Sequence, residues 1–550
     1  MQCSAEHIIN QTIKGTLGHN YAFCDDVFDA LHVLLNGNYH KYNLDQETIC
    51  SPATGVTPDA FHNIFSSQHR KEKGIYYTPM DVCEYIVCNT IMLKYFGGGT
   101  IHKTDDFTHI LNNEKDIKNL LYTESFFDPT SGAGDFLLAI LNIKLRLSNL
   151  LKKNLGDVDY LNICKTLHGN DLEQDSVDIA KLRLFLTACP FLSKKESFVK
   201  LAQILNANFY NYDFVIDSNK ITKRFDYIVG NPPYVEYGKY AQSSKITNKY
   251  GNIYANIMEN SLPLLNKTGA FGLIVPLSYI STNRMAKIRQ VIENACAEQI
   301  ILSYADRPDC LFVGAHQKIN IVFAKKAPAK QCRNWTSNYT YWYKSERSRL
   351  LGSKSIVENI FKKENIIPKI GNDIETSIYS KISSTFPNNL VNTQSQGGVD
   401  IYLNMRACFW IKAFFNSPGS KEYKKITYPN EIGDFILCLL NSSAFWIFWI
   451  FLSDCWHITA KELQAVSVPC TLKNANIFKK LAKNLLDKLE DTKVYVGTAQ
   501  TEFEYKHKLC KSEIDDIDSA IAKVYNFTTK ELDYIKSFAL KYRIGDNNDS

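Results

Sequence analysis

Residues 126–138 read Phe-Phe-Asp-Pro-Thr-Ser-Gly-Ala-Gly-Asp-Phe-Leu-Leu and carry the strongest structural signal in the chain. The apolar start predicts a short strand that ends at Asp128, and a glycine-rich turn leads from it into a helix that runs through Leu147. Gly132 and Gly134 let the backbone approach a ligand closely and bring the helix N-terminus near it. The turn lacks the Gly-x-Gly-x-x-Gly spacing of dinucleotide sites, which argues against NAD and favours a nucleoside without phosphates.

From Gly74 to about Lys326, short apolar segments alternate with helical ones. The apolar segments are bounded by Gly, Pro, Asp or Asn and include residues 126–127, 227–229, 273–275 and 319–323. Strands separated by helices predict an α/β fold with a parallel, doubly wound sheet.

Two further carboxylates follow predicted strands. Asp171 ends the sequence His-Gly-Asn-Asp, where a second strand should end, and a carboxylate there can accept hydrogen bonds from both hydroxyls of a ribose. Asp213 and Phe214 offer an acceptor for an adenine amino group and an aromatic face beside it. Each aspartate alone is typical of a turn, but three strand-end acids in order, beginning with Asp128, favour a nucleoside site.

Residues 225–234 read Phe-Asp-Tyr-Ile-Val-Gly-Asn-Pro-Pro-Tyr, an apolar strand that delivers a rigid polar turn to the carboxyl edge of the sheet. Pro232 and Pro233 fix the backbone and remove two N–H donors, so carbonyl groups remain to accept. The side-chain oxygen of Asn231 and the Pro232 carbonyl can each accept one hydrogen of an exocyclic amino group, and Tyr234 can stack on a base. A purely structural Pro-Pro turn explains none of this convergence.

Residues 74–81, Gly-Ile-Tyr-Tyr-Thr-Pro-Met-Asp, precede the glycine-rich turn. Thr78 is expected to cap a helix, with Pro79 at its first position and Asp81 three residues beyond the cap. One face of this helix is predicted to carry Val82, Cys83, Ile86, Val87 and Ile91. An ordinary capped helix has this pattern too, and the position ahead of the turn favours a part in the same site.

In this order, the motifs resemble those of the gamma-type N6-adenine DNA methyltransferases, which include type II modification enzymes and the methyltransferase part of fused type IIG restriction-modification proteins. The resemblance is specific from Gly74 to about Lys326 and looser over 327–550. It implies a Rossmann-like, S-adenosylmethionine-dependent methyltransferase sheet. Ala133 stands in the glycine-rich turn where the commoner form has serine.

The resemblance also implies a role for each motif. Residues expected to bind S-adenosylmethionine are Tyr77, Thr78, Pro79, Asp128, Gly132, Gly134, Asp171, Leu172, Asp213 and Phe214. The expected catalytic residues are those of the complete Asn-Pro-Pro-Tyr motif, Asn231, Pro232, Pro233 and Tyr234. Residues 309–326 look like the family's last sheet hairpin, which makes Phe312 the second aromatic that would hold a flipped-out adenine against Tyr234.

Four regions are expected along the chain. They are a helical leader over 1–73, the methyltransferase domain over 74–326, a mixed α+β target-recognition region over 327–470, and a C-terminal helical segment over 471–550. Aromatic and basic residues are mixed in 327–470, where basic side chains would grip phosphates and polar ones would read bases in the major groove.

The bulk composition of the 550 residues is compatible with this interpretation. The net charge of +6 permits a polyanionic partner without establishing one. The 15 cysteines have no zinc-ligand spacing, so no metal site is expected and reduced thiols in the cytoplasm are favoured. No signal peptide is predicted at the N-terminus. Residues 435–452 are apolar over about the length of a membrane span, but Asn441, Ser442 and Ser443 interrupt them, which favours a broken pair of buried helices.

The alternatives differ mainly in substrate. No nuclease motif is found ahead of residue 74, so the expected partners are double-stranded DNA and a separate restriction endonuclease. Protein-glutamine methyltransferases use the same Asn-Pro-Pro-Tyr chemistry, but those chains are short, and an RNA methyltransferase stays open on motifs alone. A recognition region in the same chain is compatible with a monomer.

Overall fold

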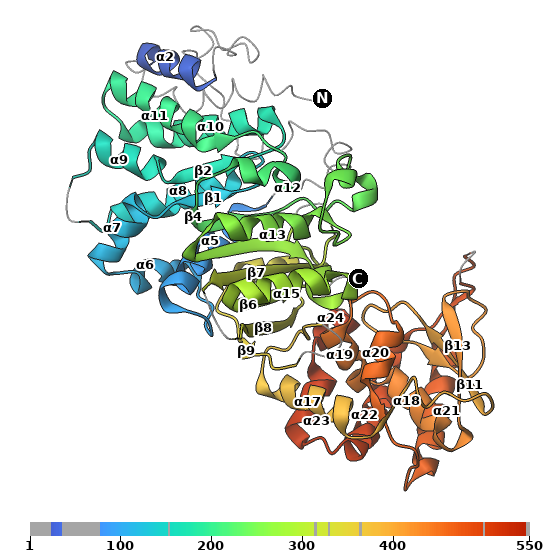
Figure 1. Ribbon diagram of the computed structural model, residues 1–550. Helices are drawn as coiled ribbons and strands as arrows, with labels where there is room; N and C mark the ends of the chain where they lie inside the picture. The colour runs from blue at the N-terminus through green and yellow to red at the C-terminus, as the bar shows by residue number, and fades with distance from the viewer. Residues whose placement is uncertain are drawn as a thin grey trace.

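The computed structural model describes residues 24–35, 78–151, 154–312, 316–327, 331–361, 366–498 and 501–545. Tyr77, and with it the first part of the expected cofactor segment, lies outside these residues, as does most of the expected leader. The described residues form a layered α/β part followed by a mostly helical part, which lies at the lower right of Figure 1.

A nine-stranded sheet among the described residues has the order β3-β2-β1-β4-β5-β7-β6-β8-β9. Its strands are β1 (Phe126–Asp128), β2 (Leu167–Asn170), β3 (Phe209–Tyr210), β4 (Phe225–Gly230), β5 (Leu265–Pro276), β6 (Cys296–Tyr304), β7 (Ile319–Lys326), β8 (Arg333–Thr340) and β9 (Val357–Glu358). All four apolar segments predicted as strands lie in it. The first five strands in this order, β3, β2, β1, β4 and β5, pair in parallel, whereas β7 is antiparallel to both β5 and β6. The sheet is therefore mostly parallel.

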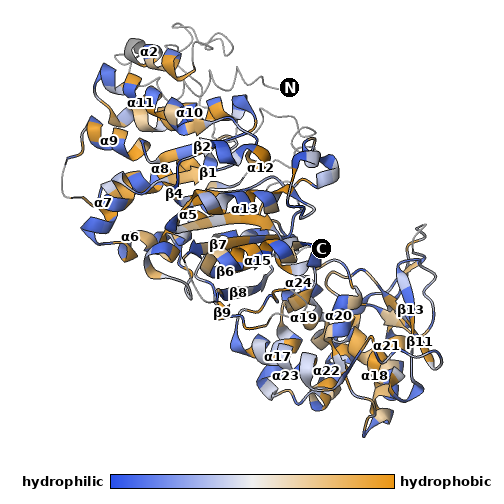
Figure 2. Cartoon of the chain, viewed as in Figure 1, coloured by the Kyte–Doolittle hydropathy of each residue, from blue (hydrophilic) through white to orange (hydrophobic). Residues whose placement is uncertain are grey.

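Helices cover both faces of this sheet, which confirms the doubly wound α/β class. The helices of the α/β part are α2 (Cys24–Leu34), α5 (Met80–Phe96), α6 (Phe107–Ile110), α7 (Glu114–Tyr122), α8 (Asp135–Ser148), α9 (Asp157–Cys164), α10 (Gln174–Ala188), α11 (Lys195–Asn208), α12 (Phe214–Asp217), α13 (Ile253–Leu264), α14 (Ser278–Ser281) and α15 (Ala286–Ala295). In Figure 1, α13 and α15 lie over β5, β7 and β6 on the viewer's side. Blue and orange alternate along α11 and α13 in Figure 2, as expected of helices with one buried face.

Helix α5 is buried over most of its surface. It packs against α8 and against β5 and β7, so the predicted apolar face is buried together with polar neighbours such as Asn89 and Thr90. A Cβ at Gly272 of β5 would stand 2.1 Å from Thr90 Oγ1 and 3.0 Å from Ile86 Cγ2. Glycine in β5 therefore lets α5 approach the sheet closely.

The sheet extends past residue 326, where a boundary between the methyltransferase and recognition regions is expected. Strand β8 pairs in parallel with β6, and β9 pairs with β8. Residues on both sides of 326 thus share one sheet, and the functional division there stays a prediction.

The mostly helical part contains α16 (Arg347–Leu350), α17 (Asp373–Ser384), α18 (Asn430–Asn441), α19 (Ser443–Leu452), α20 (Ala460–Ala465), α21 (Ala475–Thr492), α22 (Lys511–Val524), α23 (Thr529–Ser537) and α24 (Leu540–Ile544). A small antiparallel sheet joins β11 (Val399–Asn404) to β12 (Ala413–Phe414) and β13 (Tyr423–Tyr428). Two-stranded pairs are formed by β10 (Asn388–Asn389) with β14 (Ser467–Val468) and by β15 (Val494–Tyr495) with β16 (Phe503–Glu504).

Helices α18 and α19 confirm the predicted broken helix pair. They meet at an angle of 66°, and α19 is buried along its whole length. Ser442 makes the break because its Oγ accepts the Phe445 N–H at 3.0 Å and caps α19. No single helix in the described ranges is both long and apolar enough to cross a membrane, and α18 and α19 pass that test only as a pair.

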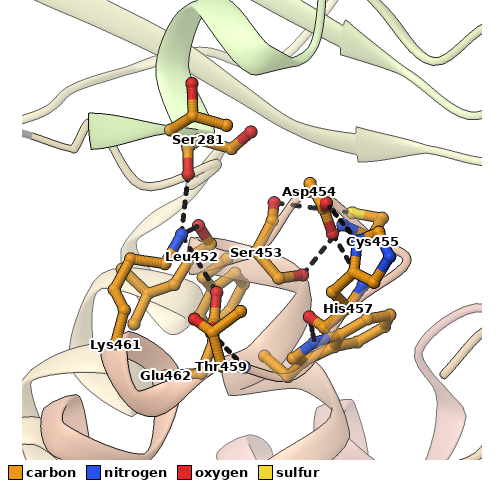
Figure 3. Close-up of polar contacts among 12 residues, drawn as sticks. Ser281, Leu452, Ser453, Asp454, Cys455, His457, Thr459, Lys461 and Glu462 are labelled. Atoms are coloured by element: carbon orange, nitrogen blue, oxygen red, sulfur yellow. Dashed lines mark hydrogen bonds and ion pairs between the residues drawn. The ribbon is translucent and has the colours of Figure 1, made fainter. Parts of the chain in front are cut away.

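Polar contacts join the two parts of the molecule. Lys461 of α20 donates to the carbonyl oxygens of Ser281 at 2.7 Å and Leu452 at 3.2 Å, as Figure 3 shows. Within the chain that follows β9, the fully buried Lys369 donates to the carbonyls of Phe451 and Ser453. These lysines satisfy carbonyl groups that the packing removes from water.

Candidate active site

The predicted site residues meet at one edge of the large sheet. Asp128 is the last residue of β1, Asp171 follows β2 and Asn231 follows β4. The three strands are parallel neighbours in the order β2-β1-β4, so their carboxyl ends lie side by side. Ligands of open α/β sheets bind at this edge.

The glycine-rich turn between β1 and α8 is hydrogen-bonded to the end of the neighbouring strand β2. The Gly132 N–H donates to Asp171 Oδ2 at 2.9 Å, and the Ser131 N–H donates to the Asn170 carbonyl at 2.8 Å. Gly132 and Gly134 have φ of +51° and +86°, a region that favours glycine. A Cβ at Gly134 would stand 3.0 Å from the Cβ of Ala180 in α10, whereas one at Gly132 would meet nothing within 4 Å.

Asp128 is buried beneath this turn. Its Oδ1 accepts the Thr130 N–H at 3.0 Å and would lie 2.7 Å from a Cβ at Gly230, so a larger residue at the end of β4 would have to displace the Asp128 carboxylate. Burial raises the pKa of the Asp128 carboxyl well above its usual range, and Asp171 and Asp135 raise it further, against the effect of the Thr130 hydrogen bond.

Asp171 is half-buried at the same edge. Its Oδ1 accepts the Glu173 N–H and its Oδ2 accepts the Gly132 N–H, each at 2.9 Å. Leu172 beside it is 56% exposed, which leaves an apolar side chain at the mouth of the site.

The Asp213–Phe214 pair differs from expectation in what it contacts. Asp213 caps the short helix α12 through the Val215 N–H, and its Oδ2 accepts the Tyr240 hydroxyl at 2.6 Å. Phe214 is 3% exposed and lies 5.8 Å from the ring of Phe127, so its ring belongs to the core. Tyr240 carries no sequence signal that links it to Asp213, and the role of Asp213 and Phe214 beside adenine stays a prediction.

The Asn-Pro-Pro-Tyr turn is fixed by side-chain hydrogen bonds. Asn231 Nδ2 donates to Thr78 Oγ1 at 3.1 Å, and Asn231 Oδ1 accepts the Tyr234 hydroxyl at 2.7 Å. The Tyr234 hydroxyl also lies 3.3 Å from the Ile274 carbonyl. These contacts orient the Asn231 carboxamide with its oxygen on the Tyr234 side.

The prediction that Thr78 caps helix α5 is wrong. The helix begins at Met80, its N-cap position is held by Pro79, and no side chain caps it there. The Thr78 hydroxyl is instead the acceptor for Asn231, and Asp81 accepts the Val82 N–H at 2.9 Å within the first turn. A tertiary contact has therefore replaced the local capping pattern.

Tyr234 and Phe312 come together although they lie far apart in the sequence. Their ring centroids are 6.4 Å apart, and the ring planes are inclined by 55°. Phe312 is 1% exposed, in the segment that connects β6 to β7. Stacking a base between two rings needs roughly 7 Å between parallel planes, twice the ~3.5 Å carbon contact distance. The rings must therefore rotate and separate before they can hold a base.

Two buried hydroxyls in the glycine-rich turn are unsatisfied. Thr130 Oγ1 and Ser131 Oγ have no hydrogen-bond partner within the described part of the chain. Buried polar groups are usually paired, so unpaired ones beside two positive-φ glycines indicate a ligand position. The turn, Asp171 and the Asn-Pro-Pro-Tyr segment thus lie along one edge of the sheet.

This arrangement of sheet, glycine-rich turn and strand-end acids defines the class of Rossmann-like methyltransferase folds. Residues 165–307 match the family model of the Eco57I restriction-modification methylase, a span that holds Asp171, Asp213 and the Asn-Pro-Pro-Tyr turn. Over these residues the chain is thus similar to restriction-modification methylases.

One protein sequence and one solved structure are similar to this chain. A Methanocaldococcus jannaschii protein, described as a type II restriction enzyme and methyltransferase, is 31% identical over 158 residues. The match covers 24% of this chain and 13% of that relative, so the chain corresponds to a small fraction of its length. The structure of the type IIL restriction-modification enzyme MmeI in complex with DNA is similar with a TM-score of 0.51 and 12% identity, over 90% of this chain and 83% of that one. At this identity the likeness concerns the fold.

Alanine at the two glycines of the turn is expected to have unequal effects. Both substitutions place a side chain at positive φ, which costs about 1–2 kcal/mol. Gly134→Ala adds the close contact with Ala180, so we expect it to lower the free energy of unfolding by roughly 1 kcal/mol more than Gly132→Ala. Urea denaturation of both variants measures the difference, and equal losses would contradict the close approach of α10 to the turn.

Proposed function

We propose that this chain is a site-specific DNA methyltransferase of a restriction-modification system that transfers a methyl group from S-adenosylmethionine to N6 of adenine. The observation that carries the proposal is the meeting of the Asn231–Tyr234 turn with the glycine-rich turn at one sheet edge, in a chain that is similar to restriction-modification methylases. Type II modification enzymes and the methyltransferase part of type IIG proteins resemble the chain in these motifs.

The residues at the edge fit S-adenosylmethionine. The unpaired hydroxyls of Thr130 and Ser131, and a turn whose glycine at 132 leaves space for a ligand, support binding there. Asp171 would accept the ribose hydroxyls, as the acidic residue at the end of a strand does in dinucleotide-binding folds. The cofactor supplies an activated methyl group, so the protein contributes position rather than a strong base.

The Asn-Pro-Pro-Tyr turn would hold the target amino group. Asn231 Oδ1 and the Pro232 carbonyl accept its two hydrogens, which directs the nitrogen lone pair away from them. Because the Tyr234 hydroxyl already donates to Asn231 Oδ1, a bound amino group shares that oxygen with it or displaces it. Tyr234 and Phe312 would then hold the flipped-out base by stacking, and proximity and orientation would supply most of the acceleration.

Double-stranded DNA is the substrate that the extension beyond the sheet supports. Residues 327–470 would grip phosphates with basic side chains and read bases with polar ones. MmeI, whose fold resembles this chain, was solved in complex with DNA. A separate restriction endonuclease is the partner that this role implies.

The proposal is tested by incubating the purified chain with tritiated S-adenosylmethionine and mixed genomic DNA, followed by digestion to nucleosides. We expect label in N6-methyldeoxyadenosine. Parallel reactions with RNA and with a peptide release factor test the same chemistry on other amino and amide groups. Label in either of these and none in DNA would overturn the proposal.

A further inference from the structure

A series of contacts between distant segments surrounds the proposed base-binding position. Asn231 bonds to Thr78, which lies directly ahead of helix α5, and to Tyr234. Tyr234 lies against Phe312. These contacts form a closed ring only if a further residue connects the start of α5 to the backbone next to Phe312.

Arg347, the first residue of α16, provides that link. Its Nη2 lies 3.2 Å from Asp81 Oδ1 in the first turn of α5, and its Nη1 donates to the Leu311 carbonyl at 3.3 Å. One planar guanidinium thus bridges two walls of the site that are far apart in the sequence. A lysine ammonium, which is a point charge on a flexible stem, cannot make the same forked bridge.

The position of Arg347 depends in turn on the C-terminal helix. The neighbouring Glu346 accepts the Tyr343 N–H at 2.9 Å and the hydroxyl of Tyr542 at 2.8 Å, and it pairs with Lys541. Lys541 and Tyr542 belong to α24, so the end of the described chain holds the turn from which Arg347 reaches the site.

The bridge contributes little to stability. The side chains of Arg347 and Asp81 are 27% and 47% exposed, and exposed ion pairs add little to the free energy of unfolding. A bridge that adds little stability but connects α5 to the backbone next to Phe312 is suited to positioning these two segments. Since Phe312 and Tyr234 must separate to admit a base, the residue that ties Leu311 to α5 sets how they close again.

We propose that Arg347 is a positioning residue that holds the Phe312 segment and the start of α5 in register, and so couples the region beyond the sheet to the closure of the base-binding position. The inference rests on the proposed function. It assigns Arg347 no contact with cofactor or base.

The test compares Arg347→Met and Arg347→Lys with the wild-type protein in single-turnover methylation at a site mapped by sequencing. Arg146→Met is the matched control, because Arg146 pairs with Glu84 of the same helix α5 at 3.0 Å, with half of its side chain exposed. We expect Arg347→Met to be slower by roughly 10-fold or more, the scale of a small misplacement of reacting groups. The methylation rate of Arg347→Lys should be close to that of Arg347→Met, and the rate of Arg146→Met should match that of the wild type.

Two readouts separate positioning from a structural defect. The melting temperature of Arg347→Met should match that of Arg146→Met. Its rate should recover on DNA whose target adenine is mispaired, because a mispaired base is less costly to extrude. The double variant with Asp81→Asn should be no slower than Arg347→Met, since both changes break one bridge.

An active wild-type protein whose Arg347→Met variant methylates at the wild-type rate would overturn this inference and leave the proposed function standing. A loss that the mispaired substrate does not relieve, or that Asp81→Asn multiplies, would also overturn it. A wild-type protein that labels no DNA would overturn the proposed function itself, and this inference with it.

Discussion

Replacing Asn231 by alanine is expected to slow DNA adenine methylation by roughly 100- to 1,000-fold, the scale seen when one positioned polar group is lost at a reacting centre. The substitution removes the carboxamide oxygen that would accept an amino hydrogen. It also removes the Thr78 contact at 3.1 Å and the Tyr234 contact at 2.7 Å, which orient the turn. Single-turnover incorporation of labelled methyl groups into DNA measures the loss.

Most of the affinity for S-adenosylmethionine should survive this change, because the glycine-rich turn and Asp171 do not contact Asn231 through any of these bonds and only Thr78 of the expected cofactor residues loses a partner. Calorimetric titration of the cofactor therefore separates chemistry from binding. Asn266→Ala is the matched control, since Asn266 donates to Asp226 at 3.1 Å at the start of β5, toward the opposite edge of the sheet. Methylation by Asn231→Ala at the rate of Asn266→Ala would remove Asn231 from the proposed mechanism.

The edge of the sheet was predictable because its signals are local. Asp128 and Asn231 each follow a short apolar run and precede a turn rich in glycine or proline, and Asp171 ends the sequence His-Gly-Asn-Asp before an acidic stretch. Parallel strands deliver such residues to one edge whatever the rest of the fold does. The turn at Gly132 and Gly134 was predictable for the same reason, since positive φ favours glycine.

Contacts between distant segments were not predictable. The bonds from Asn231 to Thr78, from Tyr240 to Asp213 and from Arg347 to two separate walls depend on how helices settle on the sheet. The periodicity of apolar residues in the sequence does not predict how the helices pack on the sheet. The prediction that Thr78 caps α5 was wrong for this reason. Its hydroxyl accepts a hydrogen bond from Asn231, a partner that only the folded chain brings near.

Strand β8 shows a second limit. Residues 333–340 contain Arg, Asn, Thr and Ser, and several of these polar side chains are buried within hydrogen-bond networks. Asn334, for example, accepts from Gln299 at 2.6 Å and donates to Glu293 at 3.0 Å. A strand that is buried through polar pairing lacks the alternation of apolar residues on which strand prediction depends.

Arg543 of α24 is expected to be among the most sensitive residues for stability. Its guanidinium lies between two indoles, 4.0 Å from the Trp410 ring and 4.2 Å from the Trp446 ring, and the residue is 4% exposed. Nε donates to the Phe409 carbonyl at 3.1 Å. Burial lowers the pKa of Arg543 to about 10, and it raises that of the nearby Asp518 to about 6, so each charge relies on its surroundings.

Arg543→Ala should lower the free energy of unfolding by roughly 3 kcal/mol, since a desolvated cation–π contact contributes about 2 kcal/mol and the truncation also leaves a cavity. Urea denaturation followed by tryptophan fluorescence measures it, because Trp410 and Trp446 report directly on this contact. Arg406→Ala is the control, as Arg406 pairs with Glu422 at 2.9 Å but is 56% exposed, and its loss should stay below about 1 kcal/mol. Equal losses in the two variants would mean that the indoles contribute nothing beyond an exposed ion pair. A larger loss for Arg543→Ala, with a slower methylation rate in native conditions, would instead connect the docking of α24 to the position of Arg347.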